Sequence, residues 1–114
     1  DNMFLFGDET AMPAIMRIIE NSPPETCVNA TVALRDAKDL QVIPSGKQVA
    51  IKTVKMEDES ALLKELYENS HKFSGCYLFF AAERGQSSKA REFIKTSSIS
   101  VKSSKISSYW TKTN

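Results

Sequence analysis

The sequence predicts an α+β fold: a mixed sheet of about four to five strands, two to three packed helices and one disulfide. Apolar residues recur at helical spacing in some segments, while alternating or β-branched residues fill others. Turn-forming residues lie between these segments. The chain has 114 residues and fits one compact domain, 1–114, in which we expect 103–114 to form a looser Ser/Lys-rich end.

The first clear element is a helix over Met12–Asn21. Pro13 suits a first helical turn, where its missing N–H costs nothing. Pro23 and Pro24 follow its end and cannot continue it. An apolar stripe at helical spacing predicts its buried face: Met12, Ile15, Met16 and Ile19. Residues 1–9 are too short and ambiguous to assign.

Three strands are predicted next, over Cys27–Arg35, Leu40–Ile43 and Gln48–Met56. The first alternates apolar and polar residues, and the third is rich in β-branched residues. Short turns at 36–39 and 44–47 separate the three. We therefore expect these strands to pair antiparallel.

The second half of the sequence predicts a helix over 58–70, a strand over Cys76–Ala82, a helix from Ser87 or Ser88, and a strand beginning at Ile99–Val101. Cys76–Ala82 is apolar without alternation, which is typical of a central strand covered on both faces. From Gln48 onward the order β-α-β-α-β permits parallel pairs with right-handed crossovers.

Three features favour an extracellular location, as a secreted protein or the ectodomain of a surface protein. Cys27 and Cys76 are the two cysteines, and we expect them to form a disulfide. Asn29-Ala30-Thr31 is an N-glycosylation acceptor, so Asn29 is the expected glycan site. The sequence begins at Asp1 rather than a methionine, as a signal-cleaved chain or an otherwise trimmed one would. No apolar run is long enough to cross a bilayer.

Positive charge is concentrated in the last third. Residues 84–114 contain seven Lys/Arg and one acid, although the whole chain has a net charge of only +1. Basic residues with interleaved aromatics bind acidic partners, and in an extracellular domain an acidic glycan or protein is a better partner than nucleic acid. The candidate binding residues are Arg84, Lys89, Arg91, Lys95, Lys102, Lys105 and Trp110.

The sequence contains no catalytic constellation, no metal-ligand spacing and no cofactor motif that we could identify. Our leading hypothesis is a non-enzymatic recognition domain that binds a protein or an acidic glycan. One alternative is a carrier of a small apolar ligand, with Tyr77–Ala82 lining its cavity. A second is an intracellular thiol-dependent enzyme that uses Cys76 with His71, the only histidine.

Overall fold

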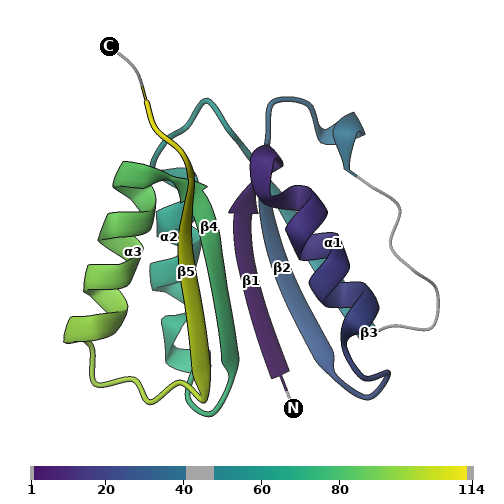
Figure 1. The fold of residues 1–114 in the computed structure, drawn as a ribbon, viewed down its shortest axis with the longest axis vertical. Helices are drawn as coiled ribbons and strands as arrows, with labels where there is room; N and C mark the ends of the chain where they lie inside the picture. Colours follow the sequence, from purple (N-terminus) through teal and green to yellow (C-terminus); the bar gives the residue numbers. More distant parts are fainter. Residues whose placement is uncertain (1, 41–47, 113–114) are drawn as a thin grey trace.

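The computed structural model describes residues 2–40 and 48–112. Its centre is a five-stranded sheet in the order β3-β2-β1-β4-β5, and every neighbouring pair is parallel (Figure 1). The strands are β1 (Asn2–Asp8), β2 (Cys27–Leu34), β3 (Gln48–Lys55), β4 (Tyr77–Glu83) and β5 (Ser103–Trp110). The α-helices are α1 (Met12–Asn21), α2 (Ala61–Asn69) and α3 (Arg84–Thr96).

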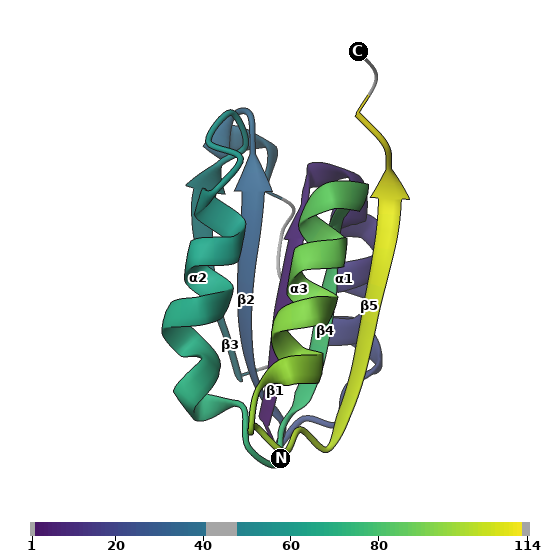
Figure 2. The ribbon, with the colours of Figure 1, turned by 90° about the vertical axis from the view of Figure 1, so that its left-hand side faces the viewer.

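The helices lie on both faces of the sheet. Helix α1 crosses one face in front of β1 and β2, and α2 and α3 lie on the opposite side (Figures 1 and 2). Crossover connections through helices are what join parallel neighbours in such sheets. The structure is therefore an open α/β sheet with helices on both faces, rather than the α+β fold that we expected.

The expected antiparallel pairing is wrong. Strands β2 and β3 are parallel, with Cys27 beside Gln48 and Leu34 beside Lys55. Residues 37–39 form a short 3-10 helix (η2, Ala37–Asp39) rather than a hairpin turn. Strands β2 and β3 begin at the same edge of the sheet, an arrangement that a tight hairpin turn cannot produce. The predicted turn at 44–47 and most of the predicted strand Leu40–Ile43 lie outside the described residues, and Leu40 itself is not in a strand.

The opening segment, which the sequence left unassigned, forms the central strand β1. Its residues from Phe4 to Asp8 are all buried, because strands pair on both its sides and helices cover both its faces. A strand buried in this way shows no alternation of apolar and polar residues. For that reason periodicity could not identify it.

Two apolar layers hold the sheet. One packs α1 against Leu5, Val32 and Phe79, and the other packs α2 and α3 against Phe6 and Phe80. The predicted central strand Cys76–Ala82 is confirmed as β4, an inner strand that begins one residue later and is buried from Leu78 to Ala82. Most of its apolar side chains fill these layers, and only Tyr77 and Phe79 also line an open groove beside α1.

The predicted disulfide is wrong: Cys27 is exposed, Cys76 is buried, and both are free. Cys27 begins β2, while Cys76 directly precedes β4, and β1 lies between these two strands. Two strand spacings amount to about 9.6 Å, more than the roughly 7 Å that a disulfide can bridge between Cα atoms.

The predicted boundaries of the other elements vary in accuracy. Helix α1 spans the predicted Met12–Asn21, and β2 and β3 match their predicted spans to within one residue. Helix α3 begins at Arg84, earlier than the predicted Ser87 or Ser88, and β5 begins at Ser103, after the predicted Ile99–Val101. Within the described residues, no helix combines the length and the apolarity needed to cross a membrane.

Candidate functional site

The strand order places a crevice at the carboxyl edge of the sheet. After β1 the chain turns to β2 and β3 on one side, and it then crosses to β4 and β5 on the other side. The chain therefore leaves β1 at Asp8 and β4 at Glu83, and the two segments that follow run to opposite faces of the sheet. In open parallel sheets, ligands bind outside the carboxyl ends of the strands at such a reversal of strand order.

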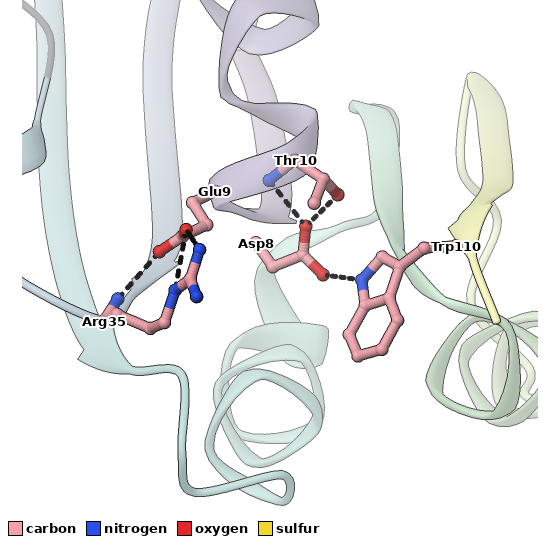
Figure 3. Close-up of polar contacts among 5 residues, drawn as sticks. All are labelled: Asp8, Glu9, Thr10, Arg35 and Trp110. Carbon is pink, nitrogen blue, oxygen red and sulfur yellow. Dashed lines mark hydrogen bonds and ion pairs between the residues drawn. The ribbon is translucent and has the colours of Figure 1, made fainter. Parts of the chain in front are cut away.

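Asp8 anchors this edge as a buried carboxylate (Figure 3). Its Oδ1 accepts hydrogen bonds from the backbone N–H of Thr10, at 3.0 Å, and from the Thr10 hydroxyl. Its Oδ2 accepts a hydrogen bond of 2.6 Å from Nε1 of Trp110, at the end of β5. A buried charge needs such donors. The first and last strands are thus joined at the candidate site.

Glu9 and Arg35 form a second link across the same edge (Figure 3). Oε2 of Glu9 lies 2.6 Å from Nη2 and 2.9 Å from Nε of Arg35, and Oε1 accepts a 2.9 Å bond from the Arg35 backbone N–H. The side-chain hydrogen bond from Arg35 is the main cause that lowers the pKa of Glu9, and Glu9 in turn raises the pKa of Arg35. The pair connects the β1–α1 turn to the residue after β2.

Glu83 occupies the start of α3. Its side chain accepts a 3.3 Å hydrogen bond from the backbone N–H of Gln86, and bonding to the backbone N–H of Gly85 is the main cause that lowers its pKa. Asp8 plays the corresponding part at the 3-10 helix η1 (Glu9–Ala11), which leads into α1. Both helical starts at the reversal point are therefore capped by carboxylates of the chain itself.

Gly7 lets α1 pack closely on the sheet. A Cβ at this position would lie 2.8 Å from Cδ1 of Ile15, 3.0 Å from Cβ of Ala11 and 3.1 Å from the carbonyl oxygen of Ala81. Close helix–strand packing is also the task of one glycine in the dinucleotide-binding turn. The other glycines of that turn are absent, because Asp8, Glu9 and Thr10 follow Gly7.

Two large open cavities lie at this edge. One, of about 570 Å³, is lined by Thr10, Arg35, Met56, Glu57 and Trp110. The other, of about 700 Å³, lies between α2 and α3, and its lining includes the ion pair of Lys112 with Glu59. Both volumes fall in the range of small-molecule sites. Since Asp8 and Glu83 already cap the helical starts, an anionic ligand here would be held by side-chain cations, above all Arg35 and Lys112.

The predicted basic patch does not form one surface. Arg84, Lys89, Arg91 and Lys95 lie on α3, whereas Lys105 lines a groove beside α1 on the other face. Lys102 precedes β5. Arg91 binds the protein itself, through a 2.9 Å hydrogen bond from its Nη2 to the carbonyl oxygen of Ile106. Of the predicted residues, Trp110 lies in the candidate site, and Lys89 lines the cavity between α2 and α3.

The remaining predicted residues lie away from this edge. Asn29 is exposed near the start of β2 and lines a shallow pocket beside α2. The single S–H of Cys76 is within hydrogen-bond distance of two carbonyl oxygens, that of Lys72 at 3.3 Å and that of Ser74 at 3.7 Å. A buried thiol bonded in this way is inert rather than nucleophilic, which removes the basis for the Cys76–His71 hypothesis.

Sequence reasoning missed five residues of the site: Asp8, Glu9, Thr10, Arg35 and Glu83. A usable signal was present: an apolar run ending in Gly7-Asp8, followed closely by a helix with Pro13 in its first turn. Recognition of this strand–turn–helix unit would have placed Asp8 at the carboxyl end of a buried strand.

Comparison with known proteins gives a consistent result. The profile of a family described as "Siderophore-interacting protein" matches residues 1–113. The structure is similar to that of the siderophore-interacting protein from Acinetobacter baumannii, with a TM-score of 0.84 and 20% identity over 97% of this chain and 46% of the other. It is also similar to the siderophore-interacting protein SipS from Aeromonas hydrophila, with a TM-score of 0.76 and 21% identity over 99% of this chain and 47% of the other. The chain thus spans about half the length of these two proteins, and no curated protein sequence matches it.

Proposed function

The chain belongs to the siderophore-interacting protein family, and we propose that it is the nucleotide-binding domain of a siderophore-iron reductase. The observation that carries this proposal is the reversal of strand order between β1 and β4, with two cavities at its carboxyl edge. Dinucleotides bind at this place in doubly wound sheets. The ligand class that we propose is a reduced nicotinamide dinucleotide, because reduction of ferric iron needs an electron donor.

The family membership corrects the functional hypothesis drawn from the sequence. An extracellular domain that recognises a protein or an acidic glycan is not supported, and neither is the apolar-ligand carrier or the thiol-dependent enzyme. The descriptions of the protein as secreted, disulfide-bonded and glycosylated lose their support with the free cysteines. The extracellular location itself stays a prediction.

The side chains at the edge suit a ligand that carries both rings and phosphates. Trp110 supplies an aromatic surface against which a planar ring can pack. Arg35 and Lys112 supply positive charge for phosphate oxygens, and Thr10 adds a hydroxyl. Each cation is already paired with a glutamate, Glu9 or Glu59, so phosphate would have to compete with these carboxylates.

The number of electrons that each reactant gives or accepts limits what the chain can do by itself. A reduced nicotinamide supplies two electrons as a hydride, whereas a ferric ion accepts one. An electron carrier must therefore accept the pair and pass the electrons on one at a time. We assign this carrier to the half of the relatives' length that the chain does not span. The expectation that the chain is not an enzyme therefore stays a prediction for the chain by itself: it binds the reductant, and iron reduction needs the additional carrier.

Isothermal titration with NADH and NADPH tests the proposal. We expect saturable binding of at least one of the two, and about a five- to tenfold increase in Kd in Arg35→Gln, since a charge-assisted bond to phosphate is lost. Lys38→Gln is the matched control: it removes a nearby exposed cation that lines neither cavity. Failure of both nucleotides to bind at millimolar concentration would contradict the proposal, as would equal effects of the two substitutions.

A further inference from the structure

The face of the sheet beneath α2 carries polar side chains beside its apolar layer. Phe4 and Phe6 of β1 belong to the layer that α2 and α3 cover, so the residues directly beside them on β2 and β3 share this face. The register sets two rows of three side chains here: Phe4, Asn29 and Ala50, then Phe6, Thr31 and Lys52. From β1 towards β3, the rows thus change from aromatic rings to polar and small groups.

A pocket of about 260 Å³ lies over these rows. Its wall on the helix side comes from Glu65 and Asn69, which are four residues apart on α2 and therefore neighbours on one face of that helix. None of the residues that line this pocket also lines either of the two cavities at the carboxyl edge. The pocket is thus separate from the nucleotide crevice.

Two nearly buried side chains of the pocket have an oxygen atom without a protein partner. Thr31 is only 7% exposed, and its hydroxyl group forms no hydrogen bond within residues 2–40 and 48–112. Glu65 binds Nζ of Lys52 through Oε2, at 2.8 Å, while its Oε1 has no partner in the same part of the chain. No described side-chain atom is both sealed from solvent and unpartnered, so these two oxygens reach open space, and both residues line the pocket. A ligand there would supply the hydrogen bonds that the fold leaves unmade.

The pocket contains both donors and acceptors, and its charges cancel. The ammonium group of Lys52 and the carboxylate of Glu65 neutralise each other. Asn69 donates from Nδ2 to the backbone oxygen of Glu65, at 2.8 Å, which leaves its Oδ1 as an acceptor. The amide of Asn29 and the hydroxyl of Thr31 each donate and accept. A ligand hydroxyl group also does both, whereas an ion of either sign would meet a like charge.

We propose that this pocket is a second ligand site, and that it binds a small neutral molecule with several hydroxyl groups, such as a monosaccharide. One hydroxyl group of the ligand donates to Oε1 of Glu65, and another bonds to the hydroxyl of Thr31. The carbon skeleton lies towards Phe4, on the inner side of the pocket. The volume is just below the range of drug-sized sites, as a ligand of this size requires. The proposal does not rest on nucleotide binding.

Glucose, galactose and ribose are suitable probes, compared with glycine, which is zwitterionic and has no hydroxyl group. By NMR of the labelled chain, we expect at least one sugar, and not glycine, to shift the amide signals of Thr31 and Lys52 in a saturable way at millimolar concentration. Thr31→Val keeps the shape of the side chain and should raise the Kd of that sugar at least about fivefold, because one hydrogen bond is lost. Thr53→Val is the matched control: it removes an exposed hydroxyl from β3 outside the pocket and should leave the Kd unchanged.

Stability of the free protein gives a second readout. Because the Thr31 hydroxyl has no protein partner, Thr31→Val should keep or raise Tm, although it weakens sugar binding. A lower Tm would show that the hydroxyl serves the fold and would overturn the proposal. So would the absence of saturable shifts with all three sugars, or an equal change of Kd in Thr31→Val and Thr53→Val. Titration of Thr31→Val with NADH and NADPH should match the unchanged protein, which separates a failure here from a failure of the nucleotide proposal.

Discussion

Glu9 has two effects that oppose each other. Its carboxylate fixes Arg35 through three close contacts, so it stabilises the turn between β1 and α1. It also neutralises the cation that we assign to a phosphate group of the ligand. Stability and affinity should therefore change in opposite directions when Glu9 loses its charge.

Glu9→Gln should lower Tm at pH 7 by about 2–4 °C, as loss of one surface ion pair does in a chain of this size. The pKa of Glu9 in the folded protein lies below its ordinary value of 4.5. Its stabilisation is thus present above pH 4.5 and is lost as the pH falls through the lower folded-state pKa. Thermal unfolding of both proteins across this range measures the effect. A Tm difference that persists or grows in acid would contradict the assignment.

The same variant should bind the nucleotide more tightly, because Arg35 is freed and a negative charge is removed from the crevice. A decrease in Kd of about threefold in the titration with NADH or NADPH is expected. Should the Kd increase instead, Glu9 would be a ligand-binding residue rather than a competitor of the phosphate.

At the scale of elements, the packing of α1 on β1 depends on Gly7. Gly7→Ala places a methyl group within 2.8 Å of Ile15 and 3.1 Å of the Ala81 carbonyl oxygen. Such overpacking costs typically about 1–3 kcal/mol. We expect a decrease of this size in the free energy of unfolding, measured in urea.

Gly85→Ala is the matched control for this substitution. The nearest atom to its new methyl group is Oε1 of Glu83, at the end of a flexible side chain that can move. The free energy of unfolding should therefore change by less than about 1 kcal/mol, since alanine also favours the helix. Equal losses in the two variants would show that α1 does not depend on this close contact.

Sequence reasoning succeeded for elements that carry a periodic pattern or a long apolar run, such as β4, and it failed for the short segment that forms β1. Helix α1 and strand β2 carry an apolar stripe or an alternation, so their bounds followed from periodicity. The central strand β1 has no such pattern, because it is buried on both faces. Without β1 the strand order could not be derived, and neither could the reversal point that defines the candidate site.

At the scale of the whole molecule, strand order decides the chemistry of the cysteines. An even cysteine count favours a disulfide only if the fold brings the two residues together. Here β1 lies between the strands that hold Cys27 and Cys76. The excess of positive charge in residues 84–114 likewise did not predict one basic surface. The cations of α3 lie on one face of the sheet, whereas Lys105 of β5 lies on the other.

Thiol alkylation checks this arrangement. Without reductant, Cys27 should react under native conditions because it is exposed, whereas Cys76 should react only after unfolding. Intact mass measured before and after denaturation counts the added groups. An unreacted chain that gains two groups only after reduction would restore the disulfide and contradict the strand order.

The candidate site contains the only tryptophan of the chain, so one spectroscopic titration tests the central claim directly. The indole of Trp110 emits where a reduced nicotinamide absorbs, and a nucleotide bound in the crevice would lie beside it. We expect NADH or NADPH to quench Trp110 emission in a saturable way and to show nicotinamide emission by energy transfer. Emission of Trp110 that decreases only linearly with added nucleotide, as inner-filter absorption alone produces, would contradict nucleotide binding at this edge of the sheet.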